Sequence, residues 1–91
     1  MEEKYTDVII DNHTKYRLFK DTIEDGELLW HHDERDRTIR IFNGKDWKLQ
    51  FDNKLPILLK DHIFIPRHTW HRVIKGTGTL KLKINKQSKQ K

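Results

Sequence analysis

Strict alternation of apolar and polar residues over short segments is the feature that most limits what this chain can fold into. Residues 80–84 alternate Leu or Ile with Lys, and residues 38–42 and 47–51 alternate in a similar way. Successive side chains of a strand point to opposite faces, so each segment predicts a strand with one apolar and one polar face. Further strands are expected at residues 6–10, 15–20, 27–30, 63–66 and 70–74, with polar or glycine-containing turns between them.

No segment shows a helical period over a dozen residues, so these strands predict an all-β barrel or sandwich. Asn43-Gly44 separates two of the strands. This dipeptide favours a tight turn because both residues tolerate positive φ. We therefore expect residues 38–51 to form a β-hairpin.

Composition and charge limit the size of the core and the classes of function. The chain has 91 residues, of which 34% are hydrophobic and 36% charged, so we expect one small domain over residues 1–85. The absence of cysteine excludes disulfides, thiolate metal sites and cysteine nucleophiles. No signal peptide or membrane span is visible, which predicts a cytoplasmic protein without a membrane partner.

Positive charge collects at the C-terminal end. All 14 acidic residues lie at or before Asp61, whereas residues 75–91 hold six lysines and no acid. We expect residues 86–91 to be a frayed basic tail. The lysines could bind nucleic acid phosphates, but no aromatic residues alternate with them to stack on bases, and a solvated sheet edge explains them as well.

The segment Ile63-Phe64-Ile65-Pro66-Arg67-His68-Thr69-Trp70-His71-Arg72-Val73 resembles the second conserved motif of small single-domain cupins. In that motif an apolar strand ends in Ile-Pro and is followed, after a short loop, by His-Arg-Val. His68 and Lys60 stand where the family usually has glycine. The resemblance covers about half the chain and implies a cupin-type jelly-roll β-barrel, with His71 as a metal ligand.

The first cupin motif is present only in part. It usually reads His, one residue, His, three or four residues, Glu, six residues, Gly. Counting back from Gly44 puts Arg37 at the glutamate position, and the longer spacing then puts His32 and Trp30 at the two histidine positions. The resemblance therefore supports His32 and His71 as ligands of a divalent ion such as Fe, Zn, Ni or Mn. His68 is our third candidate, with His31 and Asp36 as alternatives, and adjacent His31 and His32 should point to opposite faces.

Other interpretations of the same residues stay open. Arg37 could bind a carboxylate or phosphate while Trp30 and Trp47 provide stacking area, and no metal would be needed. Alternatively, side chains fill the barrel and the two tryptophans belong to its core. The chain would then be a non-enzymatic structural or interaction module, with weak nucleic-acid binding as a further alternative. The resemblance leaves enzymatic activity undecided, and together with the small size it predicts a homodimer.

Overall fold

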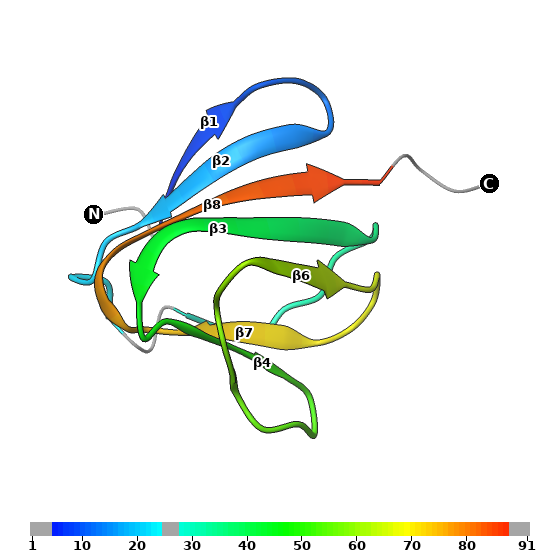
Figure 1. Cartoon of the computed structure of the whole chain (residues 1–91). Helices are drawn as coiled ribbons and strands as arrows, with labels where there is room; N and C mark the ends of the chain where they lie inside the picture. Colours follow the sequence, from blue (N-terminus) through cyan, green and yellow to red (C-terminus); the bar gives the residue numbers. More distant parts are fainter. Residues whose placement is uncertain (1–4, 25–27, 88–91) are drawn as a thin grey trace.

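The computed structural model describes residues 5–24 and 28–87, and these residues form two antiparallel sheets (Figure 1). The larger sheet has the strand order β1-β2-β8-β3-β6, and the smaller has the order β5-β4-β7. The strands are β1 (Thr6–Ile9), β2 (Thr14–Phe19), β3 (Arg37–Lys45), β4 (Lys48–Phe51), β5 (Ile57–Leu58), β6 (His62–Ile65), β7 (His71–Ile74) and β8 (Thr77–Lys86). The expected all-β architecture is confirmed.

The core lies between the two sheets and follows from the alternation in the sequence. Leu80, Leu82 and Ile84 of β8 are buried, while the lysines between them point outward. From the smaller sheet, β4 contributes Leu49, and Trp47 directly precedes that strand. Each of these five side chains is at most 3% exposed. In β8 the period-2 pattern of the sequence therefore predicts correctly which side chains face the core.

The expected hairpin over residues 38–51 is wrong. β3 pairs with β6 and β8, whereas β4 pairs with β5 and β7 in the other sheet. Gly44 lies inside β3, next to shifts in the register with β8. Its φ is 145°, and a Cβ there would lie 2.8 Å from Leu80 Cδ1. The glycine therefore serves an irregular, tightly packed strand, and the chain passes to the other sheet at Asp46, whose φ is 61°.

The strand expected at residues 27–30 is also wrong over its described part. Leu28, Leu29 and Trp30 have no strand pairing, and residue 27 lies outside the described residues. The chain instead touches the smaller sheet at one point, an isolated antiparallel bridge between His31 and His71. This single bridge decides which side chains of the segment face the barrel interior.

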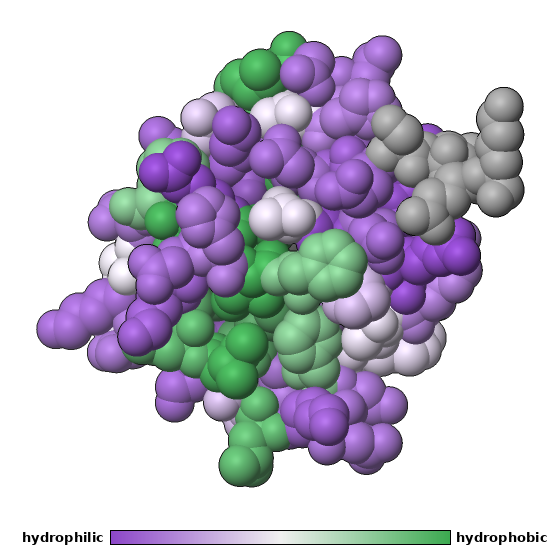
Figure 2. Space-filling view, turned by 45° about the vertical axis from the view of Figure 1, so that its right-hand side comes forward, coloured by the Kyte–Doolittle hydropathy of each residue, from purple (hydrophilic) through white to green (hydrophobic). Residues whose placement is uncertain are grey.

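β8 extends through Lys86, and the N–H of Gln87 donates to the carbonyl of Asp36 at 2.9 Å, so the boundary placed after residue 85 stays a prediction. Apolar side chains gather in the middle of one face, between hydrophilic margins (Figure 2). No helix in the described part of the chain is long and apolar enough to cross a bilayer.

Candidate metal centre

Two histidines that lie 40 positions apart in the chain meet at the open end of the barrel. The backbone N–H groups of His31 and His71 donate to each other's carbonyl oxygens at 2.9 Å. Their imidazole rings lie 4.3 Å apart, edge to face. His71 is 3% exposed, whereas His31 is open to solvent. The bridge therefore joins one buried and one accessible imidazole.

Asp33 is the third member of this group. One donor atom from each of His31, Asp33 and His71 lies within 4.8 Å of the other two. The loop that carries Asp33 is held in place because its carbonyl accepts a hydrogen bond from the N–H of His68 at 2.7 Å. Among the residues that the structure describes, this is the group of histidine and carboxylate side chains arranged to hold a metal ion.

Arg37 lies beside the group and orients the carboxylate. Its Nη2 is 3.0 Å from Asp33 Oδ1, and both side chains are mostly buried. Burial lowers the pKa of Arg37, and the charge of Asp33 opposes that shift. An arginine stays charged at neutral pH even so. The ion pair therefore fixes one of the two oxygens of Asp33.

The second oxygen of Asp33 is left without a donor. Asp33 Oδ2 is buried, has no hydrogen-bond partner in the described residues, and lies 3.5 Å from His71 Nε2. The ring of His71 is oriented by its Nδ1, which is 2.8 Å from the carbonyl oxygen of Thr69 and must donate to it. This hydrogen bond puts a proton on Nδ1, so in the neutral ring Nε2 carries the lone pair.

The protonation state of His71 decides whether its Nε2 can donate to Asp33. Burial lowers its pKa, followed by opposing effects of the Thr69 hydrogen bond and of nearby charges, so the neutral form predominates at pH 7. Nε2 of His71 and the buried Oδ2 of Asp33 are then two acceptors that lie 3.5 Å apart. A cation between them would satisfy both, and a metal-bound histidine typically donates its other ring nitrogen to a backbone carbonyl, as His71 does.

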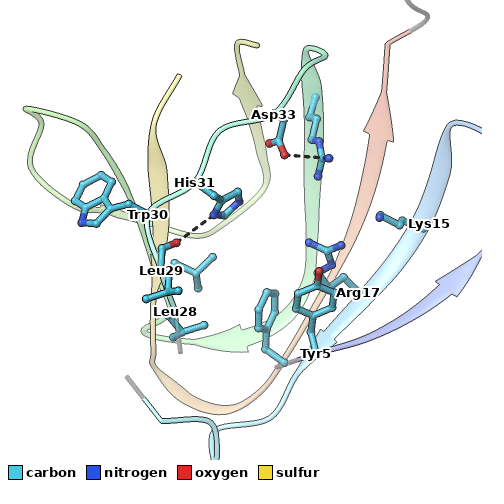
Figure 3. A pocket seen from close by; sticks show the side chains of 11 residues that line it. Tyr5, Lys15, Arg17, Leu28, Leu29, Trp30, His31 and Asp33 are labelled. Atoms are coloured by element: carbon cyan, nitrogen blue, oxygen red, sulfur yellow. Dashed lines mark hydrogen bonds and ion pairs between the residues drawn. The ribbon is translucent and has the colours of Figure 1, made fainter. Parts of the chain in front are cut away.

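A pocket opens beside His31 and Asp33 (Figure 3). It encloses about 450 Å³. A smaller space of about 50 Å³ shares His31, Asp33 and Arg37 with it and reaches His71 and the core. The larger pocket is lined by Tyr5, Lys15, Arg17, Phe19, Leu28, Leu29, Trp30, His31, Asp33, Arg37 and Val73.

The three predicted ligands His32, His68 and His71 do not come together. His32 is exposed and packs edge to face on Trp70, with the ring centres 4.5 Å apart. The ring of His68 lies 6.1 Å from that of His32, and its Nε2 contacts Glu34 Oε2 at 3.2 Å. His31, and not His32, is the histidine that lies beside His71.

The predicted ligand-binding residues also separate. Arg37 and Trp30 line the larger pocket, although Trp30 is 39% exposed at its rim. Trp47 is 1% exposed, and its Nε1 donates to the carbonyls of Thr77 and Gly78, at 3.3 and 3.1 Å. Trp47 is thus a core residue, and it is not among the residues that line this pocket.

The sequence did hold a signal for the observed group. With the shorter of the two permitted spacings before Arg37, His31 and Asp33 occupy the two histidine positions of the first motif. The longer spacing selected Trp30 and His32 instead. His68 shows why glycine is frequent at its position, because its φ of 60° lies in the left-handed region.

Comparisons with known proteins agree with this geometry at the level of the fold. No protein family model matches the chain, and no curated protein does. An RmlC-like cupin with a double-stranded β-helix fold from Methanocaldococcus jannaschii is 15% identical, with a TM-score of 0.65 over 98% of this chain and 93% of that one. A cupin superfamily protein from Desulfitobacterium hafniense is 22% identical, with a TM-score of 0.61 over 92% and 76%.

The structure of Fe(II) HppE is also similar, with 17% identity and a TM-score of 0.61 over 81% of this chain and 41% of that one. The fold and the site thus define a small β-barrel protein with its candidate centre at the open end. Its fold is that of the cupins, which confirms the resemblance drawn from residues 63–73.

Proposed function

We propose that this protein binds one divalent transition-metal ion through His31, Asp33 and His71, and holds a small molecule in the adjoining pocket. The observation that carries the proposal is Asp33 Oδ2, a buried acceptor with no hydrogen-bond partner in the described residues, which lies 3.5 Å from Nε2 of the buried His71. A buried acceptor without a partner costs about 1–3 kcal/mol, so the arrangement favours a cation.

The donor set fits such an ion. Two imidazoles and one carboxylate suit Fe(II), and imidazoles also suit Zn and Ni. The similarity of the fold to Fe(II) HppE supports iron as one candidate. Three protein ligands would leave further positions open toward the pocket, where His31 is accessible. When bound, the ion would supply Lewis acidity to an oxygen atom of the small molecule.

The chain's own residues prepare the site in two ways. Arg37 holds Oδ1 of Asp33 and leaves Oδ2 for the ion, while Thr69 fixes the ring of His71. The positive charge of Arg37 repels a cation, and the charge of Asp33 offsets that repulsion. We expect the site to depend strongly on Asp33.

The test is metal analysis of protein purified without an affinity tag, after loading with Fe(II), Zn, Ni or Mn and removal of excess ion. We expect one ion per chain in the wild type and less than a tenth of that in Asp33→Asn. Asp36→Asn is the matched control, because the Asp36 carboxylate accepts a hydrogen bond from the Arg67 N–H and lies outside the group. Absence of metal from the wild type under all four conditions would refute the proposal, as would equal loss in both variants.

A further inference from the structure

Two cations in the pocket have no part in holding the metal group. Lys15 and Arg17 lie two residues apart on β2, so their side chains share one face of the strand, and both line the pocket together with Arg37. Figure 3 shows Lys15 and Arg17 on the wall opposite His31. Three cationic side chains from two strands therefore converge on one cavity.

One carboxylate fixes two of these cations. Arg17 donates to both oxygens of Asp7, from Nε at 2.7 Å and from Nη2 at 2.9 Å, and Lys15 Nζ lies 3.2 Å from the same carboxylate. The guanidinium of Arg17 also stacks on Tyr5, 3.7 Å from the ring centre. Burial raises the pKa of Asp7, but the hydrogen bonds and charges of Arg17 and Lys15 outweigh it and lower the pKa overall.

The charges in the pocket do not balance. Its three cations face two carboxylates, Asp7 beside Lys15 and Arg17, and Asp33 beside Arg37. One positive charge is left over before any metal ion is counted. In addition, Arg37 Nε is a buried donor with no acceptor in the described residues. Both features favour an anionic ligand with acceptor oxygens.

The other wall of the pocket has the opposite character. Leu28, Leu29 and Trp30 line it, and Leu29 is 57% exposed although it is apolar (Figure 3). Val73 of β7 adds apolar surface, whereas Phe19 follows Lys15 and Arg17 on the same face of β2. The volume of about 450 Å³ lies in the range of small-molecule pockets. A ligand that fills it would contact cations on one side and apolar side chains on the other.

We infer that the pocket binds a small organic carboxylate, whose charged group lies at Lys15, Arg17 and Arg37 and whose apolar part lies against Leu28 and Leu29. The inference deepens the proposed function by naming the class of the small molecule and the residues that select it. Guanidinium groups also pair well with phosphate. The apolar wall formed by Leu28, Leu29 and Trp30 favours a carboxylate that carries an apolar chain.

The experiment is a titration of the full chain with hexanoate, its neutral counterpart hexanamide and inorganic phosphate, followed by backbone NMR shifts at residues lining the pocket. We expect hexanoate to bind at least tenfold more tightly than hexanamide and phosphate, and raised salt to weaken it. Lys15→Gln and Arg17→Gln should each weaken hexanoate about tenfold or more, since hydrogen bonds between charged groups are the strong ones. Each variant leaves Asp7 one cationic partner, and unchanged shift dispersion would show that the variant is folded.

Lys48→Gln is the control, because Lys48 is exposed on β4 and is not among the residues that line the pocket. Equal binding of hexanoate and hexanamide, tighter binding of phosphate, absence of binding or an unchanged affinity in both pocket variants would each overturn the inference. The titration is run with and without the loaded ion. Normal metal content without hexanoate binding would refute this inference alone, whereas hexanoate binding without any metal uptake would refute the proposed metal site alone.

Discussion

Exchanging one histidine of the pair His31 and His32 for glutamine separates the observed arrangement from the one expected from the sequence. His31 lies beside His71 and Asp33, whereas His32 packs on Trp70 away from that group. Both are exposed, so neither exchange opens a cavity in the core. Each variant also removes one imidazole from the unfolded chain, so the two variants should lose metal binding by the unfolded chain equally.

The size of the effect follows from linkage. An ion that binds only the folded protein, at a free concentration 100 times its Kd, stabilises it by about 2.7 kcal/mol. For a domain of this size each kcal/mol raises Tm by about 4–8 °C, so the wild type should gain about 11–22 °C. Loss of a residue that only hydrogen-bonds to a metal ligand lowers metal affinity up to about 100-fold, so loss of one of the three ligands should lower metal affinity at least as much. His31→Gln would then retain about 0.4 kcal/mol, or about 2–3 °C.

The assay is thermal unfolding followed by circular dichroism, with and without Ni or Zn. We expect His32→Gln to gain as much as the wild type and His31→Gln to gain almost nothing. A full gain in His31→Gln would refute the role given to the bridge between His31 and His71. Loss of the gain in His32→Gln alone would favour the longer motif spacing.

Three further predictions concern stability and assembly. Asp7→Asn should be less stable than the wild type at pH 7 in urea unfolding. Because the folded pKa of Asp7 lies below the ordinary value of 3.8, the wild type's advantage in stability should persist above that pH and disappear as pH falls below it. Unfolding at pH 7, 5 and 3 measures this dependence. Trp47→Phe should cost about 2–3 kcal/mol in urea unfolding, since it removes a buried N–H donor and core volume, and hexanoate affinity should not change. The homodimer stays a prediction, and sedimentation should give twice the chain mass of 11.1 kDa. If copies meet along edge strand β1, where Ile9 is 66% exposed, Ile9→Lys should lower the sedimented mass. A wild-type monomer would refute the homodimer.

Local patterns predicted the strands and the fold better than they predicted the site. The alternation in β8 and the segment around His71 depend on neighbouring residues, and both agree with the structure. The inward face of the segment after Leu28 depends instead on its bridge to His71, a contact across 40 positions that no local period reveals. An error of one residue then exchanges the two faces, which replaces His31 and Asp33 by Trp30 and His32.

Glycine gave a second misleading signal. Asn43-Gly44 is typical of a hairpin turn, but here close packing against Leu80 requires the glycine. Lys15 and Arg17 were not predicted as site residues because lysine and arginine on a strand usually face solvent. Only the pairing of β1 with β2 brings Asp7 opposite Arg17 and gives the two cations a common partner.

The central place of β8 has a consequence for biosynthesis. β8 pairs with both β2 and β3, and Thr14 is separated from its partner Asn85 by 71 positions. At about 5–20 residues per second, a ribosome needs about 4–14 s to synthesise the intervening chain. During that time β2, and later β3 once it is made, lack the strand that joins them, and their backbone edges can pair with other chains. Yield in the cell should therefore depend on translation speed and on chaperones that cover these edges.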